Sequence, residues 1–375
     1  MTGFICIITE TLPAGLLPQM AAGLGISPAL AGQTVTAYAL GSLAAAIPLT
    51  VATQGWRRRN VLLLTIVGFL MFNSITAFSS NYPLIIVARC LAGASAGLAW
   101  CLLAGYARRM VPAQLQGKAL AVAMVGTPMA LSLGVPVGTW FGAAMGWRSA
   151  FLVMSGLSLL LIGWVLAKMP DYPGRHGGQP WPLLKVFTIP GVRSVLAVVI
   201  AWMLAHNILY TYIAPFVAQA GVAGQVDSVL LVFGVAALVA IGVVGRLVDH
   251  HLRAAVLVSL AGFAGVAVVF VWMGHVPLAI YAGVAVWGLT FGGAATLLQT
   301  ALADTAGDGA DVALSMNVVA WNGAIAGGGV SGGLLLDAWG AGALAPAAAL
   351  LAVAGFFIAL QARACGFKRG ARHTH

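Results

Sequence analysis

The stretch that decides the fold lies between Arg89 and Gly142. It opens with Arg89-Cys-Leu-Ala-Gly93-Ala-Ser-Ala-Gly97 and, after a short basic connection, closes with Gly126-Thr-Pro128, Gly134-Val-Pro136-Val-Gly138 and Gly142. Apart from the connection, it is apolar enough to lie in lipid, where an arginine needs a partner or a water-filled cavity. Glycines four residues apart let helix backbones touch. Gly and Pro at membrane depth indicate bent, tightly packed and movable helices.

The composition of the whole chain indicates a membrane protein. Its 375 residues are 61% hydrophobic and 7% charged, whereas a soluble domain carries about 25% charged residues. No polar stretch is long enough to hold a soluble enzyme domain. The net charge of +10 lies in short clusters between apolar runs. That pattern indicates membrane topology and anionic lipid, not nucleic acid.

Apolar runs of about 20 residues predict spanning helices. Twelve are expected, at 3–22, 29–53, 60–79, 82–106, 118–143, 149–168, 193–218, 227–247, 254–273, 277–302, 312–336 and 343–363. The fold class is therefore an all-α membrane protein of two pseudo-symmetric bundles. We expect an N-terminal six-helix bundle at 1–168, a cytoplasmic linker at 169–192, and a C-terminal six-helix bundle with a short basic tail at 193–375.

The basic residues predict the orientation. With the N-terminus inside, every Lys and Arg except Arg89 and Arg148 falls on the inner side, as the positive-inside rule requires. Both termini are then cytoplasmic, in a bacterial inner membrane. The first apolar segment lacks a basic region before it, so no cleavable signal peptide is expected.

The two halves repeat weakly at one inner connection. The first half carries Gly55-Trp-Arg57-Arg-Arg59 and the second carries Gly245-Arg-Leu-Val-Asp249-His-His-Leu-Arg253. Two such bundles, with a site between them at mid-membrane, describe a rocking transporter.

These motifs together resemble the major facilitator superfamily, specifically its twelve-helix drug:proton antiporter branch, which includes bacterial sugar, arabinose and purine-nucleoside efflux permeases. The segment from Arg89 to Gly97 resembles the fourth-helix motif, and Gly126 to Gly142 resembles the fifth-helix antiporter motif. Thr9-Glu10…Gly15-Leu-Leu-Pro18 and Tyr210-Thr-Tyr-Ile-Ala-Pro215 resemble the first and seventh helices of the sugar and nucleoside efflux group. The resemblance implies efflux.

Two features depart from that family pattern. The inner-loop motif is degenerate in the first half because no acid precedes Arg57, while the second copy keeps Gly245 and Asp249. Only nine residues precede Glu10, so the first helix looks shortened, and one hypothesis is a mis-set start codon.

Glu10 is the one acid within the expected spans of the first half. A rise of 1.5 Å per residue places it about 15 Å from the outer edge and Arg89 about 10 Å deep. A Glu10–Arg89 pair that forms and breaks would load and release a proton. The alternatives are a fixed ion pair or a substrate acceptor.

His206 is expected near mid-depth in the seventh helix, opposite Glu10 in the pseudo-symmetric scheme. Histidine titrates near neutral pH, so the hypothesis is a proton or substrate contact. The alternative is a neutral core histidine. Asn207, Tyr210 and Tyr212 on the same helix favour the first interpretation.

We expect other polar and aromatic groups in the spans either to line a cavity or to join helices. The candidate substrate residues are Gln33, Tyr38, Trp100, His206, Asn207, Tyr210, Asn317, Trp321 and Asn322. Thr34 and Trp287 are further candidates, although most tryptophans serve as anchors or packing. The candidate gating residues are Gly93, Gly97, Gly126, Pro128, Gly134, Pro136, Gly138, Arg57, Gly245, Asp249 and Arg253. Asp304, Asp308 and Asp311 are expected in a solvated loop, with a gate contact as the alternative.

The sequence predicts a secondary transporter that exports a drug, sugar or nucleoside in exchange for protons, by alternating access. The expected partners are the lipid bilayer, protons and a small-molecule substrate, and a monomer is the default. No cofactor is expected, because the proton gradient supplies the energy and no phosphate-binding loop is present. A solute:proton symporter or a uniporter would use the same fold. A membrane-embedded enzyme or a sensor is a more remote alternative.

Overall fold

The computed structural model describes residues 1–375 except 54, 113–121, 124, 175–182 and 368–375. Helices make up the regular structure of these residues, and they fall into two compact units, Met1–Gly178 and Gln179–His375. The division lies inside the expected linker. The expectation of an all-α membrane protein is confirmed.

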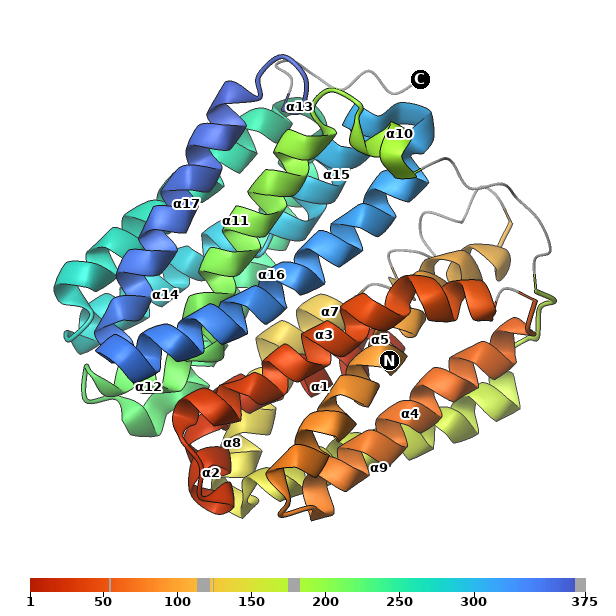
Figure 1. Ribbon diagram of the computed structural model, residues 1–375, viewed down its shortest axis with the longest axis horizontal. Coiled ribbons are helices and arrows are strands. Elements are labelled where there is room, and N and C mark those ends of the chain that lie inside the picture. The colour runs from red at the N-terminus through yellow and green to blue at the C-terminus, as the bar shows by residue number, and fades with distance from the viewer. Residues whose placement is uncertain (54, 113–121, 124, 175–182, 368–375) are drawn as a thin grey trace. The chain divides into compact units, whose positions relative to one another are not determined.

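The first unit contains the helices that run from red to yellow-green in Figure 1. They are α1 (Thr2–Gly15), α2 (Leu17–Leu24), α3 (Pro28–Ala52), α4 (Arg58–Phe78), α5 (Tyr82–Arg109), α7 (Gly126–Met129), the π-helix η2 (Ala130–Gly134), α8 (Val135–Met145) and α9 (Trp147–Lys168). Side chains cap two of the long helices: Ser27 accepts from the Leu30 amide, and Asn81 accepts from the Leu84 amide.

The second unit runs from green to blue in Figure 1. Its helices are α10 (Leu183–Phe187), α11 (Val192–Thr211), α12 (Ile213–Ala218), α13 (Val226–Met273), α14 (Pro277–Phe291), α15 (Ala294–Ala306), α16 (Ala310–Trp339) and α17 (Leu344–Gln361). Non-helical angles at His251 divide α13 into two candidate spans. Within this unit α11 packs against both α16 and α17 (Figure 1).

Ten helices of the described chain are long and apolar enough to cross a membrane, and the bent pair α1–α2 makes 11 if it is one span. The expected fifth span, 118–143, lies partly outside the described residues, and its described part forms α7, η2 and α8. Many large apolar side chains are exposed, such as Phe78 at 75% and Leu160 at 72%. Lipid contact accounts for this exposure, because hydrocarbon chains are as apolar as leucine.

Two expected spans are not straight. The span expected at 3–22 consists of two helices, α1 and α2, that meet at a bend of 70°. The break lies at Leu16, just before Pro18, which cannot donate the amide that would continue α1. The helix expected at 193–218 also divides, at Tyr212, three residues before Pro215.

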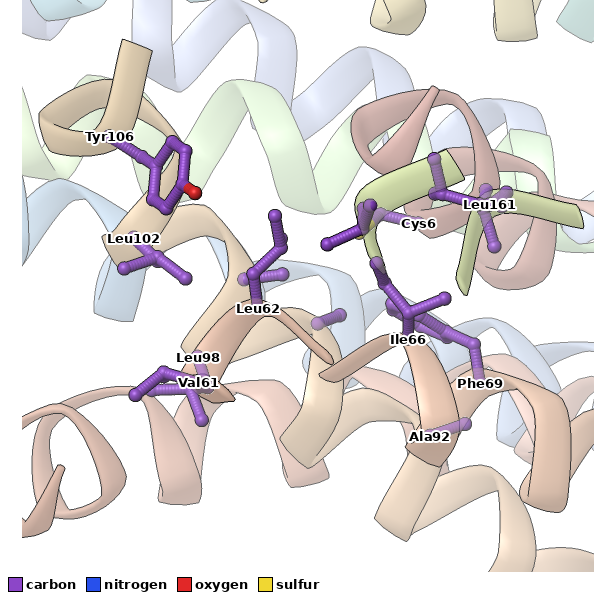
Figure 2. Close-up of a cluster of buried hydrophobic side chains, with 14 of the residues drawn as sticks. Cys6, Val61, Leu62, Ile66, Phe69, Ala92, Leu98, Leu102, Tyr106 and Leu161 are labelled. Carbon is purple, nitrogen blue, oxygen red and sulfur yellow. The ribbon is translucent and has the colours of Figure 1, made fainter. Parts of the chain in front are cut away.

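Buried side chains from α1, α4, α5 and α9 form the centre of the first unit. Figure 2 shows this cluster, which includes Cys6, Ile66, Phe69, Leu102 and Leu161. In lipid such a cluster is stabilised by close packing more than by removal of apolar surface from water. Its position fixes α1, and therefore Glu10, among the other helices of the unit.

Candidate functional site

Arg89 is fully buried in the first unit. Its Nε donates to the main-chain carbonyl of Thr34 at 3.2 Å and its Nη2 to that of Glu10 at 3.4 Å. Within the described residues, Nη1 is buried without a hydrogen-bond partner. A buried guanidinium is costly unless its donors are used, so this arginine joins α5 to α3 and α1 while keeping one nitrogen uncommitted.

Two aromatic rings support the guanidinium. Its central carbon lies 4.9 Å from the centre of the Tyr38 ring and 5.6 Å from that of Phe151, distances at which a cation is attracted to a ring face. The Tyr38 hydroxyl donates to the Cys6 carbonyl at 2.9 Å. Tyr38, expected to contact substrate, therefore has a positioning role between α1 and α3.

Glu10 lies half-buried on the last turns of α1, before the break at Leu16. Its neighbour Thr9 is fixed by a hydrogen bond from the Asn73 amide at 3.1 Å. The structure connects Arg89 to the Glu10 main chain rather than to its carboxylate, although the two side chains are near enough to interact electrostatically. The expected side-chain pair thus stays a prediction, and sequence reasoning missed the carbonyl contacts.

The glycines of the fourth- and fifth-helix motifs lie where helices touch. A Cβ on Gly93 would overlap the Tyr38 carbonyl of α3, and one on Gly97 would come 3.2 Å from the Ser42 Cα. In α8, a Cβ on Gly138 would lie 2.8 Å from the Leu12 side chain of α1. These glycines hold α3 and α8 close to the helices that carry Arg89 and Glu10.

The fifth-helix motif also changes the helix type. Residues Ala130–Gly134 form a π-helical turn that ends two residues before Pro136. Proline has no amide hydrogen and its ring crowds the preceding turn, so a wider turn relieves the clash. A Cβ on Gly134 would overlap the Ile8 side chain, and a Cβ on Gly126 would lie 2.8 Å from the Phe4 amide nitrogen of α1. Pro128 lies in α7 on the same segment.

A short segment after α9 is tied to the start of α4 in the first unit. Arg57 makes an ion pair with Asp171, and the Arg59 amide also donates to that carboxylate. Partial desolvation raises the pKa of Asp171, but these hydrogen bonds outweigh it and bring the pKa below its ordinary value. Asp171 supplies the acid that the inner-loop motif lacks before Arg57.

The second unit ties its own last segment differently. Arg253, nearly buried, donates from Nη1 to the carbonyls of Ala359 and Phe367 at 3.0 and 3.1 Å, and from Nη2 to Leu360 at 2.9 Å. It therefore caps the end of α17. Gly245 lies in α13 with open space beside it, and the side chain of Asp249 lies outside the described residues.

His206 stands in a group of aromatic rings from α11, α13 and α14, which we name the ring cluster. Its members are His206, Tyr210, Phe233, Trp287 and Phe291. The His206 and Phe291 rings are parallel within 1° with centres 3.6 Å apart, and Trp287 meets His206 edge-on at 5.2 Å. Sequence reasoning missed Phe233 and Phe291.

The ring cluster contains polar atoms that its apolar members cannot satisfy. His206 Nδ1 and Trp287 Nε1 are buried without a hydrogen-bond partner among the described residues. Each such group costs about 1–3 kcal/mol relative to a satisfied one. The interpretation of His206 as a proton or substrate contact and its interpretation as a core histidine both stay predictions.

The other predicted substrate residues serve mixed roles. Asn207 and Asn322 each donate to a carbonyl one turn earlier, Met203 and Val318, and the Asn317 Oδ1 is buried without a partner in the described part of the chain. Gln33 donates to the Ala29 carbonyl at 3.4 Å, Trp100 packs on Gly3, and Trp321 is half-buried. Asp304 is exposed near the end of α15, and the side chains of Asp308 and Asp311 lie outside the described residues.

The sequence of this chain matches a known family model. The description of that model is Major Facilitator Superfamily, and it matches residues 1–329. The chain belongs to this family. It is therefore a multi-pass membrane protein and a secondary transporter of small solutes, not an enzyme.

Relatives and a solved structure agree with the family assignment. The purine ribonucleoside efflux pump NepI of Escherichia coli O6:H1 is 31% identical over 311 residues, covering 80% of this chain and 77% of the relative. NepI of Shigella sonnei is also 31% identical, over 312 residues. The fold is similar to that of the xylose transporter XylE from E. coli in its inward-open conformation, with TM-score 0.75, 15% identity, and 95% and 93% of the two chains covered.

Proposed function

We propose that this transporter exports a small organic solute in exchange for protons, and that Glu10 carries the proton. The observation that supports this most is the buried Arg89, whose main-chain bonds leave Nη1 uncommitted beside the one acid in the spans of the first unit. Buried charges in membrane helices mark ion and proton pathways.

The arrangement allows protonation to change the charge of the site without releasing Arg89. When Glu10 is ionised, the guanidinium balances its charge; when Glu10 is protonated, a net positive charge remains. The bonds to the Thr34 and Glu10 carbonyls hold the guanidinium in both cases. A buried charge that appears and disappears biases one conformation of the bundle over another, which couples the proton to alternating access.

The glycine contacts and the π-helical turn supply the movable element. Gly93 and Gly97 let α5 slide on α3, and Pro136 with Ala130–Gly134 keeps the α7–α8 segment from forming one stiff helix. Both helices contact the site of the coupling acid. The inner ties at Arg57 and Arg253 would limit how far each half moves, as gating contacts.

The substrate class follows from similarity. The relatives are named as efflux pumps for purine ribonucleosides, so nucleosides are the first solutes to test, before sugars and drugs. A symporter would share the fold, and the direction of proton flux separates the two. The basic residues favour cytoplasmic termini. The proposed location is a bacterial inner membrane, and the proposed transporting species is a monomer.

Purified protein in liposomes that contain a pH-sensitive dye tests the proposal. An inward inosine gradient should drive protons out of the vesicles, because antiport moves the two in opposite directions. Proton entry together with inosine would indicate symport, and inosine flux without any proton movement would indicate a uniporter. The Glu10→Gln variant, reconstituted in parallel, should show no proton movement.

A further inference from the structure

The ring cluster has a geometry that packing alone does not require. His206 and Phe291 lie face to face with their centres 3.6 Å apart, and Phe233 and Trp287 close two further sides at 5.8 and 5.2 Å from His206. All of these rings belong to the second unit. They are at most 9% exposed, so they form a buried, flat-sided group inside one bundle.

The polar edges of these rings point to a ligand. His206 Nδ1 and Trp287 Nε1 find no hydrogen-bond partner in the described structure, although the residues are 6% and 1% exposed. Leucine or phenylalanine at either position would fill the same space without leaving a polar atom unsatisfied. Two such atoms next to a pair of stacked rings match the needs of a flat molecule with polar edges.

We infer that the ring cluster is the recognition site for a planar nitrogen heterocycle on the transported solute, such as a nucleobase. The heterocycle would take the place of the His206 imidazole on the face of Phe291, with the imidazole turned aside. Its edge would then accept a hydrogen bond from Trp287 Nε1 and meet His206 Nδ1. The inference rests on the proposed function, since it assumes that the protein binds an organic solute.

The chemistry separates this class from a sugar. A base offers two apolar faces and an edge of donors and acceptors, which stacked rings and one indole N–H can satisfy. A free pentose offers hydroxyl groups all round its ring, and burying these between phenylalanine rings would leave them unsatisfied. The recognised part of the solute is therefore its heterocycle, not a ribose.

Direct binding tests this inference. Full-length protein in nanodiscs is equilibrated with tritiated inosine, and unlabelled uridine, hypoxanthine and ribose compete. Hypoxanthine should compete, whereas ribose should be at least about tenfold weaker, because stacking of a base on aromatic rings carries most of the affinity. Equal competition by ribose, or no competition by the free base, would overturn the inference.

Variants locate the binding in the ring cluster. Phe291→Leu removes the flat face and should weaken inosine binding about tenfold. Trp287→Phe keeps a ring, removes the N–H and should weaken it about fivefold. The control is Phe270→Leu, a buried ring that pairs with Phe216 elsewhere in the same unit; it should leave affinity within about twofold, as expected for a position without ligand contact.

Equal losses in Phe270→Leu and Phe291→Leu would overturn the assignment. If Phe291→Leu does not yield a monodisperse protein, Phe291→Tyr keeps the flat face and Trp287→Phe decides alone. The proton-flux assay tests the proposed function separately. Base-dependent binding without proton movement would support the ring cluster as the binding site and contradict proton antiport. Proton-coupled flux of another solute without base binding would support antiport and contradict the assignment of the ring cluster.

Discussion

The two halves of this transporter begin alike and differ in what they bury. In each, the first long helix is broken near its end, at Leu16 in one and at Tyr212 in the other. Before its break the first half carries Glu10, next to the buried charge of Arg89. The second half carries His206 among four aromatic rings. The difference suggests that a repeated scaffold assigns proton coupling to one half and solute recognition to the other.

The contacts of Arg57 and Arg253 reverse this difference. The first half uses an exposed arginine, Arg57, whose side chain is 68% accessible, on the carboxylate of Asp171. The second half uses a nearly buried arginine, Arg253, on three main-chain carbonyls. A charge pair at the surface is weakened by salt and contributes little to stability, whereas buried hydrogen bonds to carbonyls are structural. The first tie can therefore open readily and the second cannot.

The largest expected effect comes from Arg89→Met, which removes the charge and its two main-chain bonds. Uphill inosine transport into proteoliposomes should fall below detection, because no group remains to balance ionised Glu10. The conservative Arg89→Lys keeps the charge but not the reach to both carbonyls, so it should retain a small fraction of the activity. Wild-type transport in Arg89→Met would remove the charged site from the mechanism.

The second prediction compares the contacts of Arg57 and Arg253. Arg253→Ala should lower the free energy of unfolding by about 2–4 kcal/mol, because it removes a nearly buried guanidinium and leaves three main-chain carbonyls without its hydrogen bonds. Arg57→Ala should leave the melting temperature almost unchanged. The contact at Asp171 is fully present above the ordinary aspartate pKa and is lost as pH falls through the lowered pKa. Melting curves at neutral pH measure the effects of Arg253→Ala and Arg57→Ala, and equal shifts in melting temperature would contradict the comparison.

The third prediction concerns the backbone contact that carries the charged site. Gly93→Ala should destabilise the protein by about 1–3 kcal/mol, because the added methyl overlaps the Tyr38 carbonyl and forces α3 from α5. Gly156→Ala is the matched control: it lies in α9, with nothing within 4 Å of the added Cβ. Equal thermal shifts for the two variants would show that the α3–α5 contact is looser than described.

The smallest expected effect is that of the first half on solute binding. Glu10→Gln should change the affinity for inosine by no more than about twofold, since a substitution without direct ligand contact is usually near-neutral for binding. Equilibrium binding of tritiated inosine measures it, with Trp287→Phe as the variant that should weaken binding. A large loss in Glu10→Gln would mean that the acid touches the solute, as the substrate-acceptor alternative holds.

Much of this fold could be predicted because each span is long and apolar, but the breaks could not be placed from proline alone. Pro13 lies inside α1 without ending it, whereas the bend at Leu16 precedes Pro18. Proline is tolerated in membrane helices when neighbouring groups satisfy the freed carbonyl. Which proline ends a helix therefore depends on packing that the sequence does not display.

The sites were predictable only in part, for the same reason. Arg89 and Glu10 are conspicuous because charges are rare in the spans, but the carbonyls that hold Arg89 belong to no motif. Asp171 lies 114 residues from Arg57 in the chain, so a loop motif could not reveal it. Phe291 is one of 15 phenylalanines in an apolar sequence and carries no local mark of its role.

The central claim is that Glu10 couples transport to protons, and a comparison of two modes of transport tests it most directly. Wild-type, Glu10→Gln and Glu10→Asp proteins are reconstituted, and each is assayed for inosine exchange at equal pH and for uphill inosine movement driven by a pH gradient. We predict that Glu10→Gln exchanges inosine at near the wild-type rate but accumulates none, and that Glu10→Asp keeps part of both. Gradient-driven accumulation by Glu10→Gln at the wild-type level would contradict the account.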